Sequence, residues 1–113
     1  MKDDFGNLYY PTENKVAFEI RSVRTPVKVK KIIKTLRDNG IYTIGRIVVF
    51  KDEKLFRAYS NKYAIKNKRT GKAWKGNKHE YWVDPHSDFV QNYNITIAKE
   101  LEQLGFDEIQ FDY

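Results

Sequence analysis

A run of β-branched and aromatic residues, IYTIGRIVVF, occupies positions 41–50 directly after Gly40. It is too apolar for one of its faces to lie in water, which is typical of a strand buried on both faces. Before it, apolar residues recur at helical spacing over residues 29–36, and Thr25 and Pro26 offer a cap and a first helical residue. The order is therefore helix, glycine, strand, with the helix predicted to begin near Pro26.

The same order recurs near the other end of the chain. Ser87 offers a helix cap, an apolar stripe at helical spacing follows over residues 90–104, and Gly105 predicts the helix end. Residues 106–111 then form a second apolar stretch with the pattern of a strand. Parallel strands need crossover connections of about a dozen residues or more, usually helices. The sequence therefore predicts an α/β fold with parallel strands.

Between these two units lies a long βα loop, residues 51–84. It exceeds the roughly 12 to 15 residues beyond which a loop usually carries a function. We expect a short helix over 53–59, a hairpin through 69–72, and a position at the carboxyl end of the preceding strand, where α/β proteins place their sites. The first 24 residues predict a loop with a turn at 5–7 and a short strand at 16–20.

Composition and charge narrow the function classes. The 113 residues are 41% hydrophobic and 15% aromatic, which excludes full disorder. The net charge of +6 comes from residues 62–78, which hold seven basic residues and no acid, while the rest of the chain has 14 basic against 15 acidic residues. The charge is therefore a property of one loop, not of the whole chain.

Other features exclude further classes. The chain has no cysteine, so it has no disulfide framework, thiolate metal site or cysteine nucleophile. Its longest unbroken apolar run, residues 47–50, is far below the roughly 20 residues of a membrane span, and no signal-peptide core follows the polar start. His79 and His86 lack the spacing of a zinc pair, so we expect no metal and no cofactor.

Residues 1–113 look like one partial domain. Two or three strands with two helices bury too little apolar surface to close a barrel of about 250 residues. Both ends also look like interruptions of strand and loop units. We therefore expect a part of a (β/α)8 TIM barrel rather than a complete domain.

Carboxylates follow the predicted strands. Asp52 comes after the first strand and Asp112 after the second, while Asp3 and Asp4 have the position that would follow an earlier strand. Because the carboxyl ends of parallel strands share one face, these acids can converge, and glycoside hydrolysis needs two carboxyl groups about 5 to 10 Å apart. The equally weighted alternative is that they cap helices or pair with basic neighbours.

Strand alternation separates the residues of the second strand. Glu108, Gln110 and Asp112 are predicted to point into a barrel, whereas the apolar residues between them pack against helices. A buried Glu108 would need a partner, and Arg46 on the neighbouring strand is the candidate.

Three aromatic residues on the long loop, Trp74, Tyr81 and Trp82, suit stacking on a sugar ring, on bases or against their own hairpin. The basic run 62–78 around Trp74 has the composition of a single-stranded nucleic-acid groove but matches no nucleic-acid motif. Packing against their own hairpin is the most favoured of these alternatives, and a nucleic acid is the least favoured.

Four blocks of the sequence carry a family resemblance: KDDFG at 2–6, IYTIGRIVVFKD at 41–52, WVDP at 82–85 and GFDEIQFDY at 105–113. With these blocks in this order over nearly the whole chain, the sequence resembles the bacterial putative glycosyl hydrolase domain family, whose members resemble TIM-barrel glycosidases. The last block is the most specific of the four.

The resemblance implies that residues 2–6 follow the second barrel strand, that 41–50 is the third strand and that 106–111 is the fourth. Asp112 then falls at the end of the fourth strand, where related barrel glycosidases commonly carry the nucleophilic carboxylate. The same mouth would be lined by Asp3, Asp4, Arg46, Lys51 and Asp52. The general acid would come from a later strand, beyond Tyr113.

The predicted function is glycoside hydrolysis of a polysaccharide or cell-wall glycan through paired carboxylates, with this segment inactive alone. The catalytic candidates are Asp112, Asp52 and Glu108. The substrate-binding candidates are Asp3, Asp4, Arg46, Lys51, Trp74, Tyr81, Trp82, Gln110 and Tyr113. The alternatives are a carbohydrate-binding or surface module without catalysis and, less favoured, a nucleic-acid binder through residues 62–78. The resemblance implies an extracytoplasmic or cell-envelope location.

Overall fold

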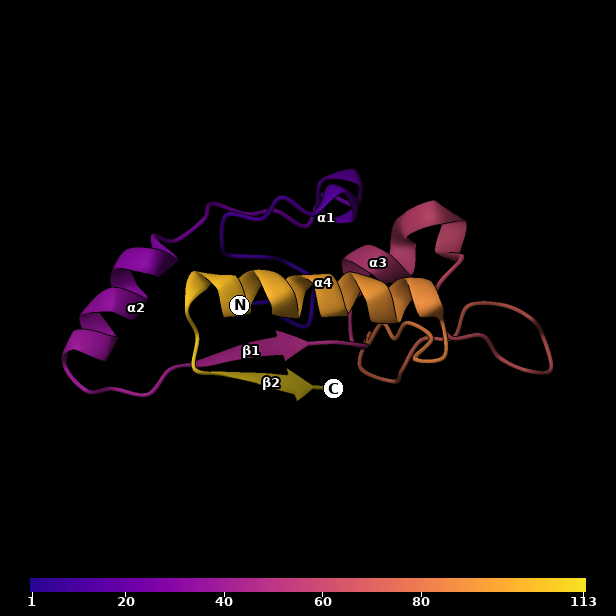
Figure 1. The fold of residues 1–113 in the computed structure, drawn as a ribbon. Coiled ribbons are helices and arrows are strands. Elements are labelled where there is room, and N and C mark those ends of the chain that lie inside the picture. Colours follow the sequence, from indigo (N-terminus) through magenta and orange to yellow (C-terminus); the bar gives the residue numbers. More distant parts are fainter.

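The computed structural model describes all residues, 1–113, and shows a small α/β arrangement in which one long helix lies over a parallel pair of strands (Figure 1). The elements in chain order are α1 (Lys15–Glu19), α2 (Val29–Asp38), β1 (Ile44–Val48), α3 (Glu53–Arg57), the short 3-10 helix η1 (Ala58–Asn61), α4 (Asp88–Leu104) and β2 (Glu108–Asp112). No helix is long and apolar enough to span a membrane.

The two strands are parallel, as predicted. Ile44 lies opposite Glu108 and Val48 opposite Asp112. On the other side of β1, Lys2 continues the parallel pairing: its N–H donates to the Arg46 carbonyl at 3.3 Å, and the Val48 N–H donates to the Lys2 carbonyl at 3.2 Å. β1 therefore lies between residue 2 and β2, while a closed barrel stays a prediction.

Helix α4 belongs to the crossover connection between β1 and β2, which allows the two strands to run parallel. The helix begins and ends where the sequence predicts. The Ser87 side chain accepts a hydrogen bond from the Val90 N–H at the start, and Gly105 ends the helix with φ 104°. Its buried stripe includes Val90, Ile97 and Leu101, and it belongs to the same core cluster as the β1 residue Ile47. Periodicity and caps therefore determined this element locally.

Helix α2 begins at Val29, three residues after the expected start. Long-range pairing holds the preceding residues extended, because the Arg24 N–H donates to the Leu8 carbonyl at 3.0 Å and the Val27 N–H donates to the Tyr9 carbonyl at 3.1 Å. The cap signals at residues 25 and 26 are therefore overridden by tertiary hydrogen bonds.

The strand predicted at 16–20 is wrong. This segment forms α1, and the Asn14 side chain caps it by accepting a hydrogen bond from the Ala17 N–H at 3.3 Å. The helix is only five residues long, too short for a clear helical period in the sequence.

The loop 51–84 contains the expected short helix and hairpin. α3 ends at Arg57, two residues early, because Tyr59 and Ser60 have positive φ values of 50° and 56°. In the hairpin, Lys66 and Ala73 form an antiparallel bridge, and the Asn67 side chain accepts hydrogen bonds from the N–H groups of residues 69 and 70. Figure 1 shows this hairpin extending past the carboxyl ends of both strands.

Candidate functional site

Charged and aromatic side chains gather at the carboxyl ends of β1 and β2. At the centre is Asp112, the last residue of β2, whose Oδ2 accepts from Arg46 Nη2 at 2.6 Å and from Arg46 Nε at 2.7 Å. The other carboxylate oxygen accepts from the Tyr113 N–H at 3.0 Å. We call this group the strand-end cluster; it consists of Arg46, Lys51, Trp82, Asp112 and Tyr113.

The Tyr113 ring connects the members of the strand-end cluster. Lys51 Nζ lies 5.6 Å and the Arg46 guanidinium carbon 5.9 Å from the ring centroid, within cation–π range. Trp82 meets the same ring edge to face, with centroids 6.3 Å apart. Tyr113 is 58% exposed, so the cluster presents an aromatic surface next to a carboxylate.

Lys51 brings two further acids to the cluster. Its Nζ lies 3.2 Å from Asp4 Oδ2 and 3.4 Å from Glu80 Oε1. Burial alone would lower the pKa of Lys51, but the hydrogen bonds to Asp4 and Glu80 raise it. Asp4 was among the substrate-binding residues predicted from the sequence, whereas Glu80 was not. The one signal for Glu80 in the sequence is its position as an acid directly after a stretch of basic residues.

Asp52 lies in the core instead of at the exposed mouth. Its side chain is completely buried, its Oδ2 is 2.7 Å from Lys2 Nζ, and its Oδ1 accepts from the Leu55 N–H at 2.8 Å, which caps α3. The expectation that Asp52 lines the same open mouth as Asp112 is therefore corrected. The alternative of a helix cap paired with a basic neighbour describes Asp52 as observed.

Asp3 holds a turn. Its carboxylate accepts hydrogen bonds from the Asn7 side chain, the Asn7 N–H, the Tyr9 hydroxyl and the Phe5 N–H, at 2.8 to 3.0 Å. Burial alone would raise the pKa of Asp3, but these hydrogen bonds together lower it below its usual value. All its bonding partners belong to residues 5–9, which indicates that Asp3 supports the chain segment that carries Asp4.

Glu108 and Gln110 are exposed, while their predicted place inside a barrel stays a prediction. Glu108 is exposed at the amino end of β2 and accepts from the Tyr42 hydroxyl at 3.1 Å. The predicted Arg46–Glu108 pair is wrong, because Arg46 lies opposite Gln110 and its side chain extends to Asp112 at the carboxyl end. Gln110 is likewise exposed, not buried.

The three loop aromatics lie in three different environments. Tyr81 packs edge to face on Phe56 at 5.2 Å and accepts from Arg57 Nη2 at 2.8 Å, so its ring serves the packing of the loop. Trp82 belongs to the strand-end cluster. Trp74 is 43% exposed and is the loop aromatic that offers a free face to solvent.

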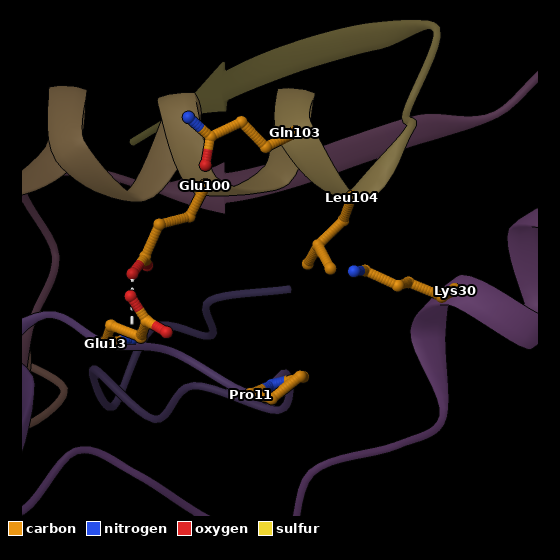
Figure 2. A pocket seen from close by; sticks show the side chains of 6 residues that line it. All are labelled: Pro11, Glu13, Lys30, Glu100, Gln103 and Leu104. Atoms are coloured by element: carbon orange, nitrogen blue, oxygen red, sulfur yellow. Dashed lines mark hydrogen bonds between the residues drawn. The ribbon is translucent and has the colours of Figure 1, made fainter.

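A separate hollow of about 310 Å³ lies near the last turns of α4, lined by residues that include Glu13, Lys30 and Glu100 (Figure 2). Because α4 runs opposite to the strands, this hollow is at their amino ends, away from the strand-end cluster. Glu100 accepts from the Tyr10 hydroxyl, the Thr12 hydroxyl and the Glu13 N–H. Glu100 therefore attaches the first segment of the chain to α4.

No group of three or more His, Asp and Glu side chains in residues 1–113 has an arrangement that could hold a metal ion.

Two comparisons found known proteins that are similar to this chain. A family model described as "Putative glycosyl hydrolase domain" matches residues 1–113. A crystal structure of a hypothetical protein from Ruminiclostridium thermocellum ATCC 27405 is similar, with 40% sequence identity and a TM-score of 0.88, over 99% of this chain. This chain spans 58% of the length of that protein. No curated protein matches the chain. The chain belongs to the putative glycosyl hydrolase domain family.

Proposed function

We propose that the protein carrying this chain is a glycoside hydrolase that acts on a polysaccharide or cell-wall glycan, with Asp112 as the nucleophilic or basic carboxylate. The family description supports the hydrolase class. The position of Asp112 at the carboxyl end of a parallel strand supports the choice of residue, because α/β barrel enzymes build their active sites at that face.

The observation that carries the proposal is the ion pair between Arg46 and Asp112. Two guanidinium nitrogens donate to one carboxylate oxygen at 2.6 and 2.7 Å, and this arrangement binds the ionised carboxylate. A nucleophile or base in glycoside hydrolysis must be ionised, whereas its partner must carry a proton. Asp112 therefore suits the first of the two roles.

The positions of the other candidate residues relative to Asp112 decide their proposed roles. Asp4, Lys51 and Tyr113 would contact the sugar, because Tyr113 follows Asp112, Lys51 lies over the Tyr113 ring and Asp4 pairs with Lys51. Asp52 and Glu108 drop out of the catalytic role, since one is buried against Lys2 and the other lies at the amino end of its strand. We propose that the general acid comes from a part of a (β/α)8 barrel outside residues 1–113, since this chain spans 58% of the length of the similar solved protein.

The test is Asp112→Asn in the protein that carries this chain, assayed by release of reducing ends from a panel of bacterial polysaccharides. We expect at least a hundredfold loss, in the range found when an acid or base is removed. Asp38→Asn is the matched control, because Asp38 is an exposed acid paired with Lys34 on α2. Unchanged hydrolysis by Asp112→Asn would remove Asp112 from the role, and no hydrolysis by the unmodified protein would reject the function.

A second candidate is a carbohydrate-binding module without catalysis. Both oxygens of Asp112 already accept hydrogen bonds, from Arg46 and from the Tyr113 N–H. This favours a binding role, because a carboxylate whose oxygens are both engaged is less free to attack a sugar or to take a proton. In that case glycan binding persists in Asp112→Asn, and the unmodified protein releases no reducing ends.

A further inference from the structure

The hairpin at the end of the molecule carries an unneutralised positive charge. We call residues 62–78 the basic hairpin; its basic residues are Lys62, Lys66, Lys68, Arg69, Lys72, Lys75 and Lys78. All seven are exposed, and none forms an ion pair with a carboxylate. The cations of the strand-end cluster differ, since Arg46 and Lys51 each have an acidic partner. Unpaired like charges on one hairpin attract an anionic ligand.

Backbone pairing orders the arms of the basic hairpin and directs its aromatic residue. The Trp74 N–H donates to the Ile65 carbonyl at 2.8 Å, and the Asn67 N–H donates to the Lys72 carbonyl at 2.9 Å. Because side chains alternate along a strand, Lys72 and Trp74 share one face, whereas Lys75 lies on the other, 5.6 Å from the Tyr81 ring. A positive charge and a free aromatic surface therefore lie side by side.

The basic hairpin is continuous with the strand-end cluster. The backbone of Lys75 forms an antiparallel β-bridge with that of Tyr81, and the backbone of Lys51 forms one with that of Trp82. Glu80, directly before Tyr81, pairs with Lys51 at 3.4 Å. The hairpin also extends past the carboxyl ends of both strands (Figure 1). An extended chain lying on the hairpin would thus continue toward Asp112.

We infer that the basic hairpin binds a polysaccharide that carries anionic groups, and so selects an acidic glycan for this site. The identity of the ligand as a glycan rests on the proposed function. The Trp74 face would stack on a sugar ring, and the lysines would contact carboxylate, sulfate or phosphate groups on neighbouring sugars. A single-stranded nucleic acid is less well matched, because such sites use successive aromatic platforms and Tyr81 is occupied by Phe56 and Arg57.

The experiment measures binding in the Asp112→Asn background, so that no ligand is cleaved. Polygalacturonate is compared with its fully methyl-esterified form, which has the same sugars without the charge. Dextran sulfate against dextran, and teichoic acid, test sulfate and phosphate. We expect at least one anionic polymer to bind about tenfold or more tightly than its neutral counterpart at low salt, with affinity falling as salt rises.

The triple variant Lys68→Gln, Arg69→Gln, Lys72→Gln should weaken this binding roughly tenfold, as expected for three exposed charge contacts. The triple variant Lys15→Gln, Lys28→Gln, Lys31→Gln removes the same charge from exposed, unpaired positions elsewhere and should leave binding unchanged. Trp74→Ala should weaken binding even at high salt, and Trp74→Phe should restore most of it.

Equal binding of charged and neutral polymers, or no effect of the hairpin triple variant, would overturn the inference. Tighter binding of poly(dT) would reassign the hairpin to nucleic acid, and equal binding of poly-glutamate would show a general polyanion surface; both reject an acidic-glycan site. If the unmodified protein binds an acidic glycan but releases no reducing ends, the proposed hydrolase fails and the hairpin inference stands. If the protein hydrolyses a glycan and the hairpin triple variant does not change that hydrolysis, the proposed hydrolase stands and the hairpin inference fails.

Discussion

Lys2 Nζ lies 2.7 Å from Asp52 Oδ2, and both side chains are completely buried. The same ammonium group donates to Asn94 Oδ1 at 2.9 Å and to the Val49 carbonyl at 3.3 Å. One buried lysine therefore joins the segment beside β1, the start of α3 and the middle of α4. Burial of these charges is tolerated because each has a partner.

Lys2→Met should lower the free energy of unfolding by about 3 to 5 kcal/mol, because it leaves Asp52 buried without a counter-charge. Chemical denaturation at neutral pH measures the change. Lys15→Met, at an exposed position, should stay within about 0.5 kcal/mol of the unmodified protein. A loss below about 1 kcal/mol for Lys2→Met would show that the ion pair is not a structural requirement.

Gly6→Ala should disturb the same ion pair. Gly6 has φ +85°, and a Cβ built on it would lie 2.0 Å from Asp52 Oδ1, so the carboxylate must move away from Lys2 and from the Leu55 N–H. We expect a loss of at least about 3 kcal/mol, which exceeds the roughly 1 to 2 kcal/mol of the left-handed backbone alone. Gly71→Ala is the control, because Gly71 has φ +66° with nothing within 4 Å of the new Cβ. Equal losses for both variants would contradict the contact with Asp52.

Asp3→Asn should change how stability depends on pH. The lowered pKa of Asp3 means that its ionised form stabilises the fold above the usual value of 3.8, and that this contribution is lost as pH falls through the folded-state pKa. The unmodified protein should therefore be more stable than Asp3→Asn at pH 7. The two unfolding curves should converge below pH 3.8. A difference that is constant from pH 7 to pH 2 would show that the charge of Asp3 contributes nothing.

The Tyr59 hydroxyl should ionise at a higher pH than an ordinary tyrosine. Its hydroxyl donates to Glu19, which joins η1 to α1, and this hydrogen bond, with burial as the next cause, raises the pKa of Tyr59 to about 12. The protonated phenol stabilises the fold below pH 10, and this contribution is lost as pH rises through about 12. Ultraviolet titration of Glu19→Gln should show one tyrosine ionising nearer pH 10. An unchanged titration curve would exclude the bond to Glu19.

Elements with strong local signals could be predicted from the sequence. Ser87 and Gly105 gave both ends of α4, and the apolar runs gave the cores of β1 and β2 to within a few residues. The hairpin followed from its turn residues. Elements that depend on distant partners could not be predicted: α2 begins late because residues 24 and 27 bond to residues 8 and 9, and α1 depends on a cap, Asn14, before a helix too short to show a period.

The candidate site shows the same division. Strand order and alternation placed Asp112 at the carboxyl edge, because the direction of a parallel strand follows from the helix that precedes it. Which cation meets which acid depends on register and side-chain reach across the sheet. Arg46 bonds Asp112 instead of Glu108 for this reason, and Lys2, 50 positions before Asp52, removes that carboxylate from solvent. Local sequence thus determined the elements and their order, whereas burial and pairing of the charges arose only when segments far apart in the chain came into contact.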